Sequence, residues 1–332
     1  MHAETAAIEV RDLVKRYSKS GFNAVDGVTF AVRPGEIFGL LGPNGAGKTT
    51  TIGVLTTNVL PTSGSAAIMG LDVARDPIGI KQRIAVVPQQ SNLDRSLKVR
   101  EILTFHAAYH GVPRRERESR ADALLDELGL GERKNDRVNR YSGGMSQRLM
   151  IARALMHAPG VLFLDEPTNN LDPQSRLFLW DRIRALNAQG LTILLTTHDM
   201  NEADLLCGRI AIMDKGRILV NDTSAELKKL IPGGNAVEVR VGLPESGAAS
   251  RVLEALRGLP GVAKVDELDS GSPGPEDDPG VVTYRLYAEA AGALVGPATQ
   301  AVLLAGAQVR DLHLKHPSLE DVFIYLTGRH LR

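Results

Sequence analysis

The chain has 332 residues, enough for two domains of roughly 150 residues each. Hydrophobic residues make up 43% and charged residues 23%, which is ordinary for a soluble globular protein and excludes collagen-like, low-complexity and disordered classes. The 39 Lys and Arg residues balance the 39 Asp and Glu residues, so the basic excess of a general nucleic-acid binder is missing and no nucleic-acid partner is expected. A single cysteine, Cys207, excludes an internal disulfide and fits a reducing compartment.

The longest apolar-leaning stretch, residues 288–307, predicts an alanine-rich helix of a soluble domain. Glu289, Gly292 and Pro297 interrupt it, whereas a membrane-spanning helix needs about 20 mostly apolar residues. The first ten residues lack the basic and apolar regions of a secretory signal. If the protein works at a membrane, we expect another chain to supply the spanning part.

Up to about residue 230, apolar runs alternate with helical stretches, the pattern of an α/β domain. The run at 161–164 is apolar on both faces, as in the central strand of a parallel sheet. Within this domain, expected over 6–230, residues of about 96–157 predict a helical subdomain. Its basic cluster around Arg114 and Arg117 is interpreted as a solvated helix face, with contact to anionic lipid as the alternative. Strands are predicted at 36–41, 84–87, 161–164, 192–196 and 209–213, and helices at 99–110 and 120–128.

A turn-rich segment at 231–235 predicts a linker to a second domain over 236–332. The expected order there is strand, helix, strand, strand, helix, strand and a final helix, which predicts a small α+β, ferredoxin-like domain. Residues 269–280 are rich in proline, glycine and acidic residues and predict an exposed loop. The predicted elements lie at 236–241, 248–257, 262–265, 281–287, from 288 onward, 309–314 and 318–326.

Residues 42–49 read GPNGAGKT, a phosphate-binding loop placed after a predicted strand and before a helix. Glycines let consecutive backbone amides curl around phosphate oxygens, and the helix that follows offers its positive end. Lys48 would reach the β- and γ-phosphates, and the Thr49 hydroxyl would hold Mg²⁺.

Residues 161–167 read VLFLDEP, a buried strand that delivers two carboxylates at the sheet edge where ligands of parallel sheets bind. Asp165 is predicted to hold Mg²⁺, and Glu166 to orient or activate the water that attacks the γ-phosphate. A helix cap would explain one carboxylate there but not both.

Residues 141–149 read YSGGMSQRL, with Ser142 as a predicted helix N-cap and two glycines that leave the first amides bare. This makes a second anion site on a helix N-terminus. Capped helix starts are common, so the segment gains meaning from the phosphate loop in the same chain.

These motifs together resemble the nucleotide-binding subunit of an ATP-binding cassette (ABC) transporter. The phosphate loop, YSGGMSQRL, VLFLDEP, NNLDP at 169–173 and LLTTHDM at 194–200 occur in the family's order, over about residues 8–230. The resemblance implies the P-loop NTPase cassette fold with ATP and Mg²⁺ as ligands. It assigns catalysis to Glu166, His198 and Gln89, and Mg²⁺ binding to Thr49, Gln89 and Asp165. It assigns nucleotide binding to Tyr17, Gly42, Pro43, Asn44, Gly45, Ala46, Gly47, Lys48, Thr49, Thr50, Ser142, Gly143, Gly144 and Asp172.

Several roles follow from the resemblance alone. Tyr17 would stack on adenine, with an ordinary strand-end tyrosine as the alternative. Gln89 would touch Mg²⁺ and the attacking water, although the adjacent Gln90 could be confused with it. Asp172 would communicate across a dimer, and His198 would contact the γ-phosphate.

The signature departs from the family pattern at two positions. Tyr141 stands where Leu is usual, and Met145 stands where Gln is usual. A methionine cannot make the side-chain hydrogen bonds of glutamine, which puts nucleotide affinity at that half-site in question.

Residues 317–328, PSLEDVFIYLTG, resemble the C-terminal end of exporter ATPases of the daunorubicin-resistance type. They also read as an amphipathic helix, and both interpretations can hold. The resemblance implies an ATPase peripheral to the cytoplasmic face of the cell membrane. Its expected partners are an integral-membrane permease of about six spans and a second copy of the ATPase. The alternatives are a soluble ABC ATPase acting on ribosomes or DNA repair, and a non-catalytic regulatory nucleotide binder.

Overall fold

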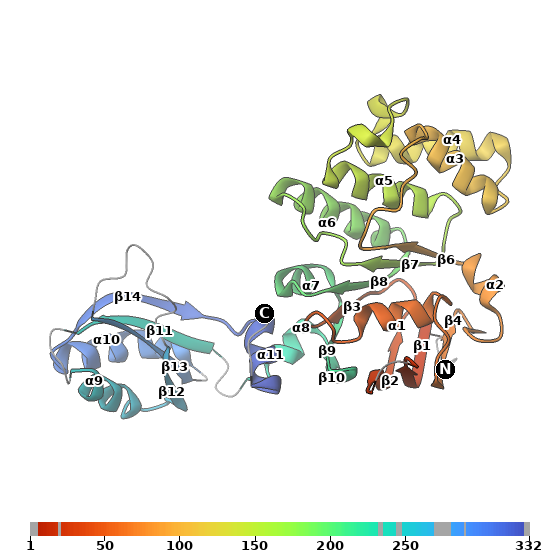
Figure 1. Cartoon of the computed structure of the whole chain (residues 1–332). Helices are drawn as coiled ribbons and strands as arrows, with labels where there is room; N and C mark the ends of the chain where they lie inside the picture. Colours follow the sequence, from red (N-terminus) through yellow and green to blue (C-terminus); the bar gives the residue numbers. More distant parts are fainter. Residues whose placement is uncertain are drawn as a thin grey trace. The chain divides into compact units, whose positions relative to one another are not determined.

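The computed structural model describes residues 6–18, 21–231, 235–243, 248–268, 280–288 and 290–328. The chain divides into two compact units, Met1–Ser224 and Ala225–His330 (Figure 1). The division falls shortly before the predicted linker at 231–235, of which residues 232–234 lie outside the described part.

The first unit is built on a six-stranded sheet of order β10-β9-β3-β8-β7-β6. Its strands are parallel apart from β10, which pairs antiparallel with β9. Every residue of β3, β7 and β8 is buried. For β7 this confirms the prediction of a central parallel strand that is apolar on both faces. The strands are β3 (Ile37–Leu41), β6 (Ile84–Val87), β7 (Val161–Asp165), β8 (Thr192–Thr197), β9 (Arg209–Asp214) and β10 (Arg217–Asp222).

A second, antiparallel sheet of order β2-β1-β4-β5 packs against the first, and its strands were not predicted. The buried apolar residues of the two sheets belong to one core, in which the rings of Phe30 and Phe38 stack with centroids 5.2 Å apart. Helix α1 contacts both sheets. The elements are β1 (Ile8–Arg16), β2 (Asn23–Val32), α1 (Lys48–Leu55), β4 (Ser63–Ile68), β5 (Leu71–Asp72) and α2 (Pro77–Lys81).

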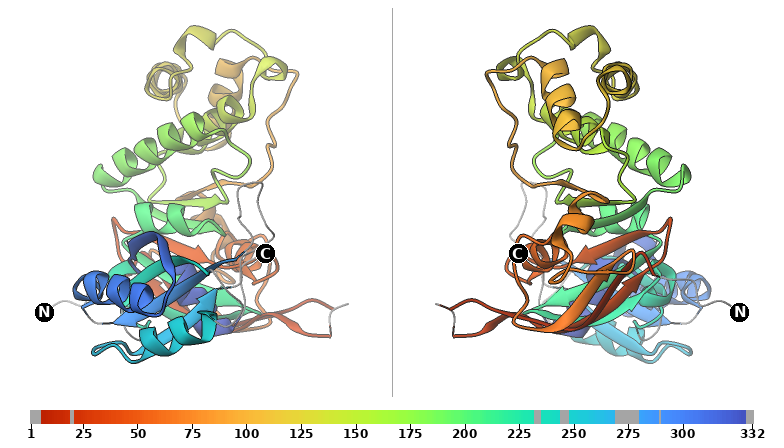
Figure 2. Two further views of the ribbon diagram at one scale, coloured as in Figure 1. Left: turned by 90° about the vertical axis from the view of Figure 1, so that its left-hand side faces the viewer. Right: turned by 90° about the vertical axis from the view of Figure 1, so that its right-hand side faces the viewer.

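Helices α3, α4 and α5 contact one another and form the predicted helical subdomain, seen in yellow and green at the top of both views in Figure 2. Helix α4 already begins at Arg114, so the expected start at residue 120 was wrong. Arg114 pairs with Glu118 and Arg120 with Glu116 along its surface, which explains how the basic cluster fits a helix. The helices are α3 (Val99–Tyr109), α4 (Arg114–Glu127), α5 (Gly143–Leu155), α6 (Pro173–Ala188) and α7 (Met200–Leu206), with 3-10 turns at Gly131–Arg133 and Val138–Arg140.

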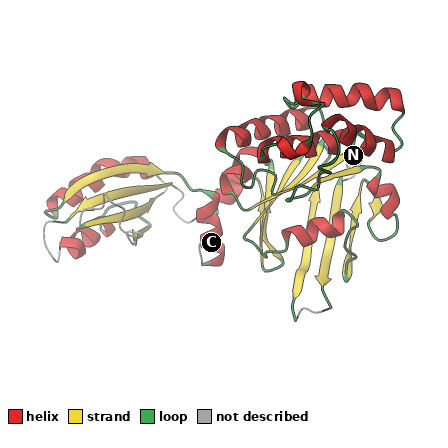
Figure 3. Ribbon diagram, turned by 45° about the horizontal axis from the view of Figure 1, so that its top comes forward, coloured by secondary structure: helices red, strands yellow, loops and turns green. Residues whose placement is uncertain are grey.

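The second unit has a four-stranded antiparallel sheet of order β12-β13-β11-β14, the predicted ferredoxin-like arrangement. Helices α9 and α10 contact each other and cover one face of this sheet (Figure 3). The elements are α8 (Ser224–Lys228), β11 (Asn235–Gly242), α9 (Ala248–Arg257), β12 (Lys264–Leu268), β13 (Val281–Ala288), a 3-10 turn (Ala291–Leu294), α10 (Val295–Leu304), β14 (Gln308–Lys315) and α11 (Leu319–Thr327).

Two expected boundaries in this unit were wrong. The strand expected at 262–265 begins at Lys264, and the helix expected from 288 begins with the 3-10 turn at Ala291. Residues 269–279 of the predicted loop lie outside the described residues. Among the helices that the structure describes, none combines the length and apolar character that crossing a bilayer requires.

Candidate active site

The phosphate loop turns from β3 into α1 in close contact with neighbouring backbone. A side chain at Gly42 would collide with the carbonyl oxygen of Met213. Gly47 has a φ of +107°, and a Cβ there would lie 2.5 Å from the carbonyl oxygen of Ala24. Gly47 is also the N-cap of α1 and offers no side chain to its first amides. The loop therefore needs glycine at both positions and presents a helix N-terminus to an anion.

The ammonium group of Lys48 lies under the loop, with the residue only 4% exposed. Its Nζ donates to the carbonyl oxygens of Gly42 at 2.7 Å and Pro43 at 3.1 Å, and lies 3.4 Å from Glu166 Oε1. Burial lowers the pKa of Lys48, while the Glu166 carboxylate opposes that shift. A buried ammonium is stabilised by nearby negative charge, so this position suits the phosphate chain of a nucleotide.

Hydroxyl and carboxylate oxygens converge where β7 and β8 end. Asp165 Oδ1 accepts a hydrogen bond from Thr196 Oγ1 at 2.5 Å and lies 3.4 Å from Thr49 Oγ1. Magnesium prefers hard oxygen ligands, and two of them reach this point from α1 and β7. The residues present therefore fit a Mg²⁺ ion.

Glu166 is the most heavily contacted side chain of the site, and the residue is 8% exposed. Its backbone has a φ of +48°, uncommon for a residue with a side chain, and its amide donates to the Thr196 carbonyl oxygen at 3.1 Å. Four side chains from four segments of the chain contact the carboxylate. They are Lys48 at 3.4 Å, Gln89 at 2.9 Å, Asn169 at 3.1 Å and His198 at 3.4 Å.

The structure thus brings six of the predicted residues together: Lys48, Thr49, Gln89, Asp165, Glu166 and His198. Gln89, rather than the adjacent Gln90, makes the hydrogen bond to Glu166. Two neighbours had no assigned role in the sequence. Asn169 follows Glu166 by three residues in the same segment, and Thr196 stands two residues before His198, so both lie inside motifs that had been recognised.

Ser142, Gly143, Gly144 and Asp172 form a separate group. Ser142 caps α5 by accepting from the amide of Met145 at 3.3 Å, and Asp172 caps α6 by accepting from the amide of Ser175 at 2.9 Å. A Cβ on Gly144 would lie 2.5 Å from Ser175 Oγ, so the two helix starts touch. Among the interactions of the described residues, none joins this group to the phosphate loop.

Tyr17 follows the last residue of β1 and is 42% exposed, with the Lys15 ammonium 5.1 Å from its ring centroid. Its face is accessible for stacking, but no interaction of the described residues ties it to the loop. Tyr141, the first departure in the signature, donates from its hydroxyl to the Arg133 carbonyl oxygen at 3.2 Å. Burial raises the pKa of Tyr141 to about 12.

Comparisons with known proteins agree with this geometry. The family model described as "ABC transporter" matches residues 25–169. The daunorubicin resistance ATP-binding protein DrrA2 of Streptomyces coeruleorubidus is 40% identical over 97% of this chain and 95% of its own length. The linearmycin resistance ATP-binding protein LnrL of Bacillus subtilis (strain 168) is 35% identical over 98% and 99%.

Solved structures match the first unit's fold. A dimer of the ATP-binding cassette MJ0796, bound to ADP and Pi in a post-hydrolysis state, is 27% identical with a TM-score of 0.60. It covers 65% of this chain, and the match spans 98% of that cassette. The near full-length relatives, the family model and the phosphate loop with its two carboxylates show that this chain belongs to the ATP-binding proteins of ABC transporters, which are ATPases coupled to transport.

Proposed function

We propose that this chain binds MgATP and hydrolyses it to energise an exporter of drugs, antibiotics or lipid-like compounds. The observation that carries the proposal is the convergence of Lys48, Gln89 and His198 on the carboxylate of Glu166. Two relatives that match nearly the whole chain are named for daunorubicin and linearmycin resistance, and a third for Nod factor export. These names support the class of cargo.

The site divides substrate binding among different groups. The loop from Gly42 to Thr50 and the Lys48 ammonium would hold the phosphates, and Tyr17 would stack on the adenine. Thr49 and Asp165, with Gln89, would hold Mg²⁺. When bound, this ion supplies positive charge against the negative charge that develops on the transferred phosphoryl group.

Glu166 is proposed to orient the attacking water and accept its proton. Its carboxylate is fixed by hydrogen bonds from Gln89 and Asn169, so little rearrangement is needed for it to act as a base. His198, with its side chain partly open to solvent, would contact the γ-phosphate from the end of β8. Both residues are present, which disfavours a purely regulatory nucleotide binder.

A head-to-tail pair of chains would complete the site. Within one chain the start of α5 at Ser142, Gly143 and Gly144 forms a group of its own, together with Asp172. A second chain could place this start on the phosphates held by the first chain. The dimeric cassette among the similar solved structures supports this arrangement.

We further propose that a separate permease of about six spans docks this ATPase at the cytoplasmic face of the cell membrane. ATP can drive the permease only through a difference in its affinity for the open and closed dimer. The test is co-expression of this chain with a candidate permease of about six spans in a drug-sensitive host. We expect lower daunorubicin accumulation, and copurification of both chains from membranes. Lys48→Ala should abolish the first effect and leave the copurification intact. Unchanged accumulation of daunorubicin, linearmycin-like and lipid-like compounds would contradict an export role while leaving ATP hydrolysis intact.

A further inference from the structure

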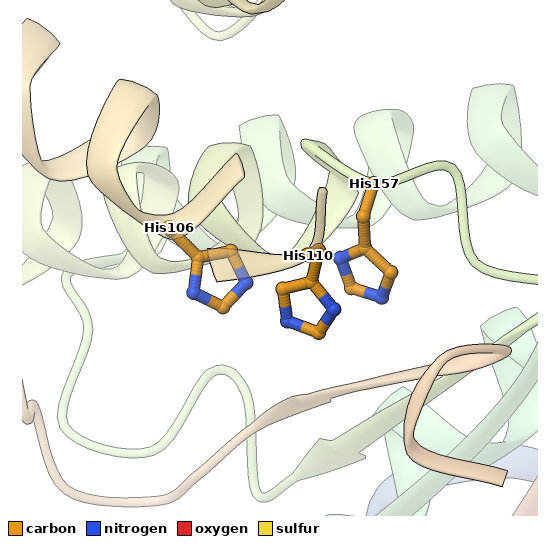
Figure 4. Close-up of side chains that lie close together, drawn as sticks. All are labelled: His106, His110 and His157. Carbon is orange, nitrogen blue, oxygen red and sulfur yellow. The ribbon is translucent and has the colours of Figure 1, made fainter. Parts of the chain in front are cut away.

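Three histidines of the helical subdomain lie together, away from the residues assigned to ATP. His106 is in the last turn of α3, His110 caps the same helix four residues later, and His157 follows α5 (Figure 4). One ring nitrogen from each lies within 4.8 Å of the others. Helical spacing of four residues places two of these side chains on one face.

The hydrogen bonding of His157 prepares one of its nitrogens to bind a ligand. Its Nε2 lies 2.9 Å from the carbonyl oxygen of Ile84. A carbonyl oxygen only accepts, so Nε2 carries the proton and Nδ1 keeps its lone pair. Nδ1 is buried and has no hydrogen-bond partner among the residues that the structure describes. Metal-binding histidines are commonly oriented by such a bond from the opposite ring nitrogen to a backbone carbonyl.

Burial disfavours the charged form of all three rings. Burial lowers the pKa of His106 to about 4, with the charges of His110 and Arg153 adding to the shift, and burial also lowers the pKa values of His110 and His157. Neutral imidazole is the form that binds metal.

Two arginines near the cluster have other partners. Arg153 donates to Asn92 Oδ1 at 2.6 Å, and Arg120 donates to the Met156 carbonyl oxygen at 3.1 Å. Their guanidinium charges raise the cost of a nearby cation, which favours a metal that bonds strongly to nitrogen over one held by charge alone.

We propose that His106, His110 and His157 bind one divalent transition-metal ion of the Zn²⁺ class. Three imidazoles suit zinc, copper, nickel or cobalt, whereas Mg²⁺ and Ca²⁺ prefer oxygen ligands. Zn–N bonds of about 2.1 Å in a tetrahedron place the nitrogens about 3.4 Å apart, so no pair of ring nitrogens has to approach by more than about 1.4 Å. The rings of His110 and His157 are stacked at 3.9 Å, and at least one of them turns to point its lone pair at the ion. Water fills the fourth position.

Occupancy of this site joins three elements. His106 and His110 belong to α3, His157 follows the helix that begins at the signature, and its Nε2 is bonded to Ile84 of β6. Strand β6 leads directly to Gln89, which contacts Glu166. A bound ion therefore cross-links the helical subdomain next to the strand that positions Gln89.

The test is metal binding by the untagged full chain, stripped with a chelator and free of nucleotide. We expect one Zn²⁺ per chain by competition with a chromophoric chelator, and a Co²⁺ complex with the visible absorption of tetrahedral coordination. Millimolar Mg²⁺ should not compete. His110→Gln and His106→Gln should each weaken Zn²⁺ binding by about tenfold or more.

His313→Gln is the matched control, because His313 is an exposed histidine of β14 paired with Glu238. It should bind as the wild type does. Circular dichroism and ATP binding of each variant separate a lost ligand from a lost fold. No saturable Zn²⁺ uptake by the wild type, or equal affinity in wild type and His110→Gln, would overturn the proposal. Neither result bears on the proposed ATPase function.

Discussion

Glu166 combines an uncommon backbone conformation with an enclosed carboxylate. A positive φ in a residue with a side chain costs on the order of 1–3 kcal/mol and persists where surrounding contacts over-determine it. Here the carbonyl oxygen of Thr196 accepts a hydrogen bond from the Glu166 amide, while Gln89 and Asn169 donate hydrogen bonds to the carboxylate. The uncommon backbone conformation thus directs the Glu166 carboxylate toward Lys48, next to the phosphate loop.

Lys48→Ala should lower ATP turnover by about a hundredfold or more. The lost ammonium would otherwise stabilise charge on the transferred phosphoryl group, an effect worth roughly 3 kcal/mol for a preorganised donor. Steady-state phosphate release measures it, and Lys81→Ala, an exposed lysine of α2, is the control. Hydrolysis by Lys48→Ala near the wild-type rate would remove this site from the reaction.

The sequence predicted Lys48 and Glu166 as site residues because each stands in a motif whose chemistry needs that residue type. It did not predict the φ of Glu166 or the contacts of Asn169 and Thr196. The Thr196 contacts depend on how β7 and β8 pair, which brings residues about 30 positions apart into contact, whereas the Asn169 contact depends on the local turn after Glu166.

At the scale of elements, the N-termini of α5 and α6 pack closely against each other because Gly144 has no side chain. Gly144 leaves room for Ser175, whose Oγ and Cβ would lie 2.5 and 2.9 Å from an added Cβ. Gly143, one residue earlier, has only the Leu171 side chain nearby, at 3.9 Å. Packing therefore requires a glycine at position 144 of the signature but leaves room for a side chain at position 143.

Gly144→Ala should destabilise the first unit by about 1–3 kcal/mol, because the helix starts must separate. That corresponds to a fall in Tm of roughly 2–4 °C per kcal/mol for a unit of this size. Gly143→Ala should have a much smaller effect, and Gly144→Ala combined with Ser175→Gly should recover most of the loss. Equal Tm values for the two single variants would show that the close approach is unimportant.

In the second unit, an ion-pair network joins α11 to the sheet. Arg285 of β13 donates to Glu238 of β11 at 2.6 Å and lies 3.4 Å from Asp321 of α11. Although burial alone would raise the pKa of Glu238, the hydrogen bond and charge of Arg285 hold it below its ordinary value. The same balance lowers the pKa of Asp321, with bonds from Ser318 opposing burial.

These lowered pKa values predict loss of stability in acid. Near pH 4 the unfolded chain binds protons that the folded chain does not, so stability falls as pH drops below about 5. Glu238→Gln should lower the stability of the sheet at neutral pH. It should also reduce how much further that stability falls as the pH drops. Hydrogen exchange of β11 and β13 amides in the full chain, from pH 7 to 4, measures both effects. Glu254→Gln, at an exposed position of α9, should behave as the wild type; identical profiles for Glu238→Gln would refute the coupling.

Elements were predictable where the pattern was regular. Strands such as β7 are continuous apolar runs, and β11 alternates cleanly. Strand β1 was not predicted because its register shifts between Val10 and Leu13, where Asp12 has a φ of +46°. This bulge breaks the alternation of apolar and polar residues. The first turns of helix α4 were not predicted because they are almost wholly charged and lack the apolar periodicity of a helix.

For the whole molecule, the two units have separate apolar cores. Every residue assigned to nucleotide binding lies in the first unit, so the second unit is proposed to serve dimer or transporter function. The sequence could mark this division through its turn-rich segment, but it did not indicate the task of the second unit, which carries none of the recognised motifs of the nucleotide site.

A chain ending near Pro232 should therefore still bind ATP with close to the wild-type affinity. The measure is fluorescent-nucleotide titration of both proteins, with the melting curve of the shortened chain as a check on folding. A shortened chain that folds stably yet loses ATP affinity would contradict this division of labour.

ATP is proposed to join two copies of this chain, and Glu166 is proposed to be needed for the hydrolysis that separates them. Glutamine keeps the size of Glu166 but loses its charge and basicity, so Glu166→Gln should hold MgATP without hydrolysing it. Light scattering after size exclusion with saturating MgATP should then give twice the 35.7 kDa of one chain. Asp165→Asn, with weakened Mg²⁺ binding, should remain a monomer under the same conditions. A monomeric Glu166→Gln protein would contradict ATP-driven dimerisation, and one that turns over ATP at the wild-type rate would contradict the role of Glu166 in hydrolysis.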